Sequence, residues 1–175
     1  VDNVNGSIVI DAWDRNEVKL EVVKIADSRQ RLSDVEIKID AKPDSLRIET
    51  EFGRNRNWNC SGYCRLEVQY KLTVPRGAVL NGIETVNGSV TVSNFTNMTR
   101  ISAVNGMVKA TNLRGTASLS TVNGEVSADF DRLDAGSKIS LETVNGRVNL
   151  AIPSDSSATI RAESLNGSIT NDFSL

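Results

Sequence analysis

Residues 84–92 read ETVNGSVTV, and the Val-Asn-Gly at their centre recurs along the chain at a nearly constant spacing. From Asn87 onward, successive asparagines are 18, 18, 22 and 21 residues apart. A period in this range is typical of repeat proteins, in which each unit stacks on its neighbours. The Asn-Gly pairs are Asn5-Gly6, Asn87-Gly88, Asn105-Gly106, Asn123-Gly124, Asn145-Gly146 and Asn166-Gly167.

Apolar residues alternate with other residues on both sides of each Asn-Gly pair, as expected of half-buried strands. Asn and Gly both tolerate a positive φ angle, so we interpret each pair as a corner where the backbone turns sharply between two strands. The third residue after each asparagine is always Val or Ile. These residues are Ile8, Val90, Val108, Val126, Val148 and Ile169.

Two all-β folds fit a unit of strand, corner and strand. An antiparallel β-meander or sandwich follows if each Asn-Gly is a hairpin turn. A β-solenoid of about 18–22-residue repeats follows if each unit is a coil stacked on the previous one. We favour the solenoid, because the same residue types recur at every offset from the corner and the inward positions carry small aliphatic side chains. The solenoid predicts one internal column formed by Val90, Val108, Val126 and Val148.

Residues 1–175 are expected to form a single β-repeat domain in two parts. Residues 81–175 carry the regular coils, whereas residues 1–80 hold a first coil and longer alternating strands. We expect these longer strands to be an antiparallel excursion that covers one end of the stack, where strand edges would otherwise be unpaired. The expected strands are 7–13, 17–25, 35–41, 45–52 and 65–74.

The composition excludes several classes of function. The 175 residues include no histidine, which removes histidine-based catalysis and histidine-ligated metals. The formal net charge is −2 with no basic stripe, so we expect no nucleic-acid partner. The apolar runs are too short to span a bilayer. We therefore expect no catalytic residues, no metal and no cofactor.

Two cysteines, Cys60 and Cys64, lie in the sequence CSGYC. They can form a small disulfide or remain free thiols, whereas a metal site would lack further ligands. Gly62 would let the loop fold tightly enough for the disulfide, which we favour. A disulfide would imply an oxidising compartment and hence an exported protein.

Around these cysteines the chain gathers Arg54, Arg56, Trp58 and Tyr63. Exposed aromatic and arginine side chains suit the recognition of a glycan or a protein, so this loop is the candidate ligand-binding site. The alternative is a purely structural loop whose Trp58 packs on the sheet edge.

Two sets of carboxylates are weaker candidates, and we expect both to be solvated. The aspartates could suggest a calcium loop, but their order departs from the EF-hand pattern. The glutamates recur three residues before an asparagine and could suggest glycosidase chemistry. The two sets are Asp129, Asp131 and Asp134, and Glu84, Glu142 and Glu163.

Three longer stretches together resemble a bacterial family of proposed adhesins of unknown function, whose Val-Asn-Gly repeat domain is also called toastrack. They are DNVNGSIVIDAWDRNEVKLEVVK, LTVPRGAVLNGIETVNGSVTV and LAIPSDSSATIRAESLNGSITNDF. The resemblance implies a single-stranded right-handed β-helix in an exported or membrane-anchored envelope protein, often beside membrane-stress components. It also implies further repeats beyond Leu175. It supplies no catalytic residues.

The leading functional hypothesis is therefore a non-enzymatic module of the cell envelope that binds an envelope protein or a surface glycan. We expect it to be periplasmic, on the cell surface or extracellular. The alternatives are a carbohydrate-active β-helix enzyme and a purely structural spacer.

Overall fold

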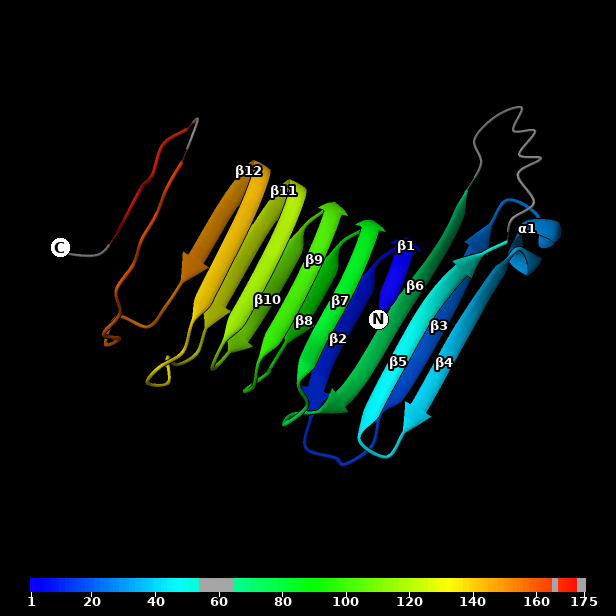
Figure 1. Cartoon of the computed structure of the whole chain (residues 1–175), viewed down its shortest axis with the longest axis horizontal. Coiled ribbons are helices and arrows are strands. Elements are labelled where there is room, and N and C mark those ends of the chain that lie inside the picture. Colours follow the sequence, from blue (N-terminus) through cyan, green and yellow to red (C-terminus); the bar gives the residue numbers. More distant parts are fainter. Residues whose placement is uncertain (54–64, 165–166, 173–175) are drawn as a thin grey trace.

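The protein is described here by a computed structural model that places residues 1–53, 65–164 and 167–172. It is all-β apart from one short helix, and its strands form one curled sheet of mixed orientation (Figure 1). The elements are β1 (Asp2–Asn5), β2 (Ile8–Trp13), β3 (Lys19–Ala26), α1 (Arg29–Ser33), β4 (Val35–Lys42), β5 (Ser45–Phe52), β6 (Leu66–Pro75), β7 (Leu80–Asn87), β8 (Val90–Ser93), β9 (Thr99–Asn105), β10 (Val108–Leu113), β11 (Ala117–Phe130) and β12 (Ile139–Ala151).

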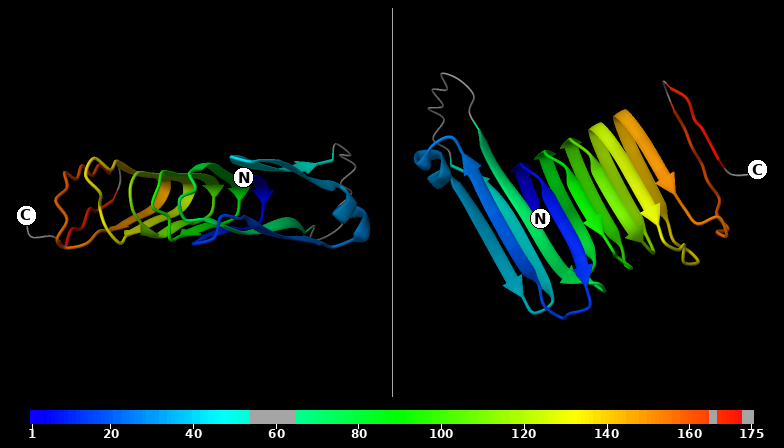
Figure 2. Two further views of the ribbon diagram at one scale, coloured as in Figure 1. Left: turned by 90° about the horizontal axis from the view of Figure 1, so that it is seen from below. Right: turned by 180° about the vertical axis from the view of Figure 1, so that it is seen from behind.

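Successive repeats stack in parallel, and the Asn-Gly corner joins the two faces of the stack. On one face, β1, β7, β9 and the first half of β11 pair side by side. On the other face, β2, β8, β10 and the second half of β11 do the same. Strand β12 pairs with the whole of β11 around the corner. The stack is seen from below and from behind in Figure 2.

The expected internal column is present. Val108 pairs with Val90 and with Val126, and Val126 pairs with Val148. Val90, Val108 and Val126 are fully buried. Because these pairings between repeats are parallel, the antiparallel meander is wrong for the repeats. The expectation that Val148 is internal is also wrong, since it is 43% exposed on a strand that pairs only with β11 among the described residues.

The strands of the N-terminal part form the antiparallel excursion. Strand β3 pairs with β6 and β4 pairs with β5, both antiparallel. Strands β6 and β5 then join the stack in parallel, on β2 and β1 respectively. The bounds of β2 to β6 agree with the expected strands within about two residues, because period-2 alternation is strong in these segments.

A polar cluster fills the interior where the excursion meets the first coil. Asn3 is 1% exposed, and its amide donates to the Val68 carbonyl at 2.9 Å. The Thr50 hydroxyl donates to Asn3 Oδ1 at 3.1 Å and lies 2.7 Å from the Tyr70 hydroxyl. Burial raises the pKa of Tyr70, which the hydrogen bond to Thr50 partly offsets. A buried polar network that satisfies its members in this way fixes one arrangement of the strands.

The glycine of each corner lies against the backbone of the preceding coil. A Cβ atom on Gly88 would lie 2.1 Å from the Gly6 carbonyl oxygen, and one on Gly106 would lie 2.1 Å from that of Gly88. The same distance is 2.0 Å from Gly124 to Gly106. A side chain at these positions would therefore force neighbouring coils apart.

The asparagines of the corners form a ladder of hydrogen bonds along the stack. Each side-chain amide donates to the Oδ1 atom of the preceding asparagine at 2.9 Å. Our interpretation that these asparagines supply a positive φ is wrong, because no corner asparagine that the structure describes has one. Their side chains instead tie the coils together. The ladder runs through Asn5, Asn87, Asn105, Asn123 and Asn145, and Asn166 lies outside the described residues.

The single helix among the described residues, α1, is too short and too polar to cross a bilayer.

The internal column yields the first prediction. Val126→Asp places a charge in a position with 0% exposure and should lower the free energy of unfolding by about 3 kcal/mol or more. Val122→Asp is the matched control, since Val122 lies on the same strand and is 39% exposed. Urea unfolding measures both, and equal losses for the two variants would contradict the column.

The second prediction concerns the corner glycines. Gly106→Ala should lower the free energy of unfolding by about 2 kcal/mol or more, because its Cβ would overlap the Gly88 carbonyl. Gly77→Ala serves as the control, since nothing lies within 4 Å of a Cβ there. Thermal unfolding should leave the Gly77 variant close to wild type. A Gly106 variant that is equally unaffected would show that the coils have room to separate.

Candidate functional site

The loop proposed from the sequence lies outside the described residues. This applies to Arg54, Arg56, Trp58 and Tyr63, and also to Cys60 and Cys64. Both the ligand-binding role of the loop and its disulfide therefore stay predictions. Its flanking residues Gly53 and Arg65 are described. Arg65 immediately precedes β6 and Arg76 immediately follows it, so the two arginines lie at opposite ends of this strand.

A different set of polar side chains gathers on the edge of the stack opposite to the Asn-Gly corners. Two asparagines there, Asn94 and Asn112, have φ angles of 68° and 53°. Asparagine tolerates this left-handed conformation better than most residues, because its short side chain bonds locally. Asn94 follows β8 and Asn112 lies near the end of β10, so the two occupy equivalent places in neighbouring coils.

These asparagines form a second ladder that ends on a carboxylate. The amide of Asn112 donates to Asn94 Oδ1 at 3.0 Å, and the amide of Asn94 donates to Asp11 Oδ1 at 2.7 Å. Asp11 Oδ1 also accepts from the Ser93 hydroxyl at 2.8 Å and from the Ala12 N–H at 2.9 Å. Burial alone would raise the pKa of Asp11, but these hydrogen bonds and the charge of Arg76 together lower it.

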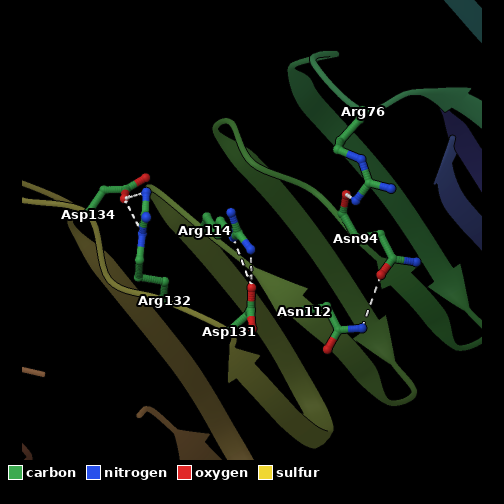
Figure 3. A network of polar contacts seen from close by, with 7 residues as sticks. All are labelled: Arg76, Asn94, Asn112, Arg114, Asp131, Arg132 and Asp134. Atoms are coloured by element: carbon green, nitrogen blue, oxygen red, sulfur yellow. Dashed lines mark hydrogen bonds and ion pairs between the residues drawn. The ribbon is translucent and has the colours of Figure 1, made fainter. Parts of the chain in front are cut away.

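Two arginines flank the second ladder (Figure 3). Arg76 Nε donates to Asp14 at 2.9 Å, and its Nη1 lies 3.5 Å from the Asn94 carbonyl oxygen. Arg114 is held by two hydrogen bonds to Asp131, one of them 3.0 Å long. The pairing with Arg76 lowers the pKa of Asp14. Both guanidinium groups therefore have fixed positions and keep further N–H groups for a ligand.

Together these side chains line a shallow groove of about 400 Å³. The groove offers the remaining guanidinium N–H groups as donors, and the Asn112 Oδ1 atom accepts no hydrogen bond from the described residues. Along this edge Arg76 and Arg114 face three carboxylates, so the charge is nearly balanced. The carboxylates are those of Asp11, Asp14 and Asp131. Such a surface suits an uncharged ligand that both donates and accepts hydrogen bonds. The lining residues are Arg76, Asn94, Thr96, Asn112, Arg114 and Asp131.

The weaker carboxylate candidates are placed as follows. Asp131 pairs with Arg114 and Asp134 pairs with Arg132 at 2.8 Å, so both aspartates face a cation of the protein itself. Among the described residues, no three His, Cys, Asp or Glu side chains lie close enough together to hold a metal ion.

Two of the glutamates have partners within their own segments. Glu142 lies beside Ser120 in the sheet and accepts from the Ser140 hydroxyl at 2.8 Å. Glu163 lies in a segment without strands and accepts from Arg161 at 2.9 Å.

The groove was missed in the sequence, although one signal was available. Asn94 and Asn112 are separated by the same 18-residue step as Asn87 and Asn105. A comparison of the spacing of all asparagines with the repeat period would have revealed the second ladder. Arg76 carries no such signal, because it precedes the regular repeats and reaches the groove only through the pairing of β6 with β2.

The parallel stack and its two asparagine ladders define an all-β repeat protein with a polar groove on one edge. The chain belongs to the family described as Toastrack DUF4097, whose family model matches residues 80–175. This match confirms the resemblance found in the sequence.

A search of solved structures finds similarity to a proposed cell adhesion protein from Clostridium sporogenes. The identity is 11%, the alignment covers 87% of this chain and 91% of the other, and the TM-score is 0.42. A search of curated proteins gives no match.

The third prediction tests the Asp11 hydrogen bonds. Because the pKa of Asp11 is lower in the folded state, the ionised carboxylate stabilises the fold above the unfolded value of about 4. This contribution is lost as the pH falls through the lower folded pKa. The stability advantage of wild type over Asp11→Asn should therefore be largest at neutral pH and shrink on acidification. Urea unfolding at a series of pH values measures it, and a difference independent of pH would contradict the assignment.

Proposed function

We propose that the chain is a non-enzymatic binding module of the bacterial cell envelope that contacts a surface glycan through the groove beside Asn94 and Asn112. The observation that carries this proposal is a set of fixed, partly unsatisfied donors and acceptors on one edge of a rigid stack. Fixing polar groups before binding lowers the ordering cost that a ligand must offset.

The chemistry of the groove favours a neutral glycan over an anionic one. Each sugar hydroxyl both donates and accepts, which matches the arginine N–H groups and the free Asn112 oxygen. The carboxylates of Asp14 and Asp131 already neutralise the two arginines. The edge therefore has no positive potential that would draw a polyanion.

Export of the chain and a part in envelope-stress sensing belong to the same proposal. They are supported by the family resemblance and by the Cys60 and Cys64 pair expected to form a disulfide in an oxidising compartment. The loop with Arg54, Arg56, Trp58 and Tyr63 remains the second candidate contact, on the strength of its residue types.

The coils are further proposed to form a single-stranded right-handed β-helix. The parallel, in-register pairing of successive repeats supports this proposal, because crossover connections between parallel strands are almost always right-handed.

The fourth prediction tests the groove. Asn112→Gly/Arg114→Ala removes an acceptor and a donor, while glycine keeps the left-handed backbone. On a glycan array, this variant should bind the wild-type ligand about tenfold or more weakly, as expected from two lost hydrogen bonds. Lys109→Ala is the control, because Lys109 is exposed on the face of β10. Thermal unfolding must show that all variants fold.

A parallel variant, Trp58→Ala/Arg56→Ala, separates the two candidate contacts. Loss of binding in this variant alone would move the site to the loop. Wild-type protein that binds no glycan on the array would contradict the glycan proposal and favour the spacer.

A further inference from the structure

The glycine N–H groups of the corners are used in the stack. Each donates to the carbonyl oxygen of the asparagine in the next coil, at distances of 2.9 to 3.0 Å. The side-chain amides are also held, because each inner asparagine donates to the coil before it and accepts from the coil after it. The glycine donors are Gly6, Gly88 and Gly106, and their acceptors are Asn87, Asn105 and Asn123.

This arrangement matters because Asn-Gly is a chemically labile pair, and asparagine is among the thermolabile residues. The backbone nitrogen of the glycine can attack Cγ of the asparagine side chain. A C–N bond forms, ammonia leaves, and a succinimide ring results. Water then opens the ring to aspartate or isoaspartate. The attack requires a glycine nitrogen that has given up its hydrogen bond and an asparagine side chain free to turn toward it.

In the inner coils the stack opposes both requirements. At Asn105, the side chain donates to Asn87 and accepts from Asn123, each at 2.9 Å. The Gly106 N–H donates to the Asn123 carbonyl at 3.0 Å. Reaction at Asn105 would have to break these contacts first.

The corner of β12 differs. Asn145 donates to Asn123 at 2.9 Å, but its Oδ1 atom accepts from none of the described residues. In the other corners the glycine N–H points toward the coil that follows, so the Gly146 N–H points away from β11. Strand β12 pairs only with β11 among the described residues, and the segment after it forms no strand in 152–164 or 167–172 (Figure 1).

We propose that Asn145 is a site of spontaneous deamidation, whereas the ladder protects the equivalent inner corners Asn105 and Asn123. The product would also disturb the end of the stack. A carboxylate at position 145 replaces the donor that faces Asn123 Oδ1 with a second acceptor. An isoaspartate would in addition lengthen the backbone where a Cβ on Gly146 would lie 1.7 Å from the Gly124 carbonyl.

Trypsin makes the test internally controlled. Cleavage yields ISAVNGMVK, residues 101–109, and ISLETVNGR, residues 139–147. Each peptide contains a single asparagine, and in both it lies within Val-Asn-Gly. Purified full chain is aged at mildly alkaline pH, digested briefly, and the deamidated fraction of each peptide is followed by mass spectrometry. An unaged sample corrects for deamidation during digestion.

In the folded protein, Asn145 should deamidate at least roughly tenfold faster than Asn105. The reason is that fewer hydrogen bonds must break before the Asn145 side chain can meet the nitrogen of the next glycine. In concentrated urea the two rates should become similar, because the local sequences match. Equal rates in the folded protein would overturn the proposal. A rate difference that persists unchanged in urea would also overturn it, since local sequence and not the stack would then be the cause.

Discussion

The close approach of one corner to the next is the constraint on which the stack depends. The carbonyl oxygen of each glycine occupies the space where a Cβ of the following glycine would be, at 2.0 to 2.1 Å in the inner coils. Only glycine allows neighbouring strands to reach their ordinary separation of about 4.8 Å at this point. Register follows from the same contact, because a strand that slipped by one residue would bring a side chain against this oxygen.

The two edges of the stack use asparagine for different physical reasons. At the corners the asparagine backbone is extended, and the side chain serves only to link coils. On the opposite edge, Asn94 and Asn112 turn the backbone through the left-handed region and also link coils. The corner ladder satisfies its inner amides on both sides. The edge ladder leaves one acceptor free beside two arginines, which is why recognition is proposed there.

The sequence predicted what period-2 alternation controls. It placed the strands β2 to β6, the column through Val90, Val108 and Val126, and the parallel stacking of coils. It assigned the wrong role to the corner asparagines, because a hydrogen bond between residues 18 apart exists only after the coils have stacked. The groove was missed for a similar reason. Its lining residues lie at the ends of four strands, β6, β8, β10 and β11, which meet at one edge of the stack but are separated along the chain.

The two ends of the described stack are not equivalent, and one inward position shows why. One inward position is occupied in four successive coils by Asn3, Thr85, Ala103 and Thr121, in that order. Thr121 donates to the Gly106 carbonyl of the coil before it at 3.1 Å. The comparable Gly6 carbonyl is taken at 3.2 Å by the amide of Asn3, and the Thr85 hydroxyl is left without a hydrogen-bond partner in the described residues.

The unpaired Thr85 hydroxyl costs about 1–3 kcal/mol of folding stability. The hydrogen bonds among Asn3, Thr50 and Tyr70 offset this cost, because they tie the first coil to β5 and β6. An asparagine in this column therefore identifies the coil on which the excursion docks. Farther along the column, a threonine links its coil to the one before it, as Thr143 does by donating to the Gly124 carbonyl at 3.1 Å. One inward residue thus sets the first coil apart from those that follow it, whereas the inner corners are alike from one coil to the next.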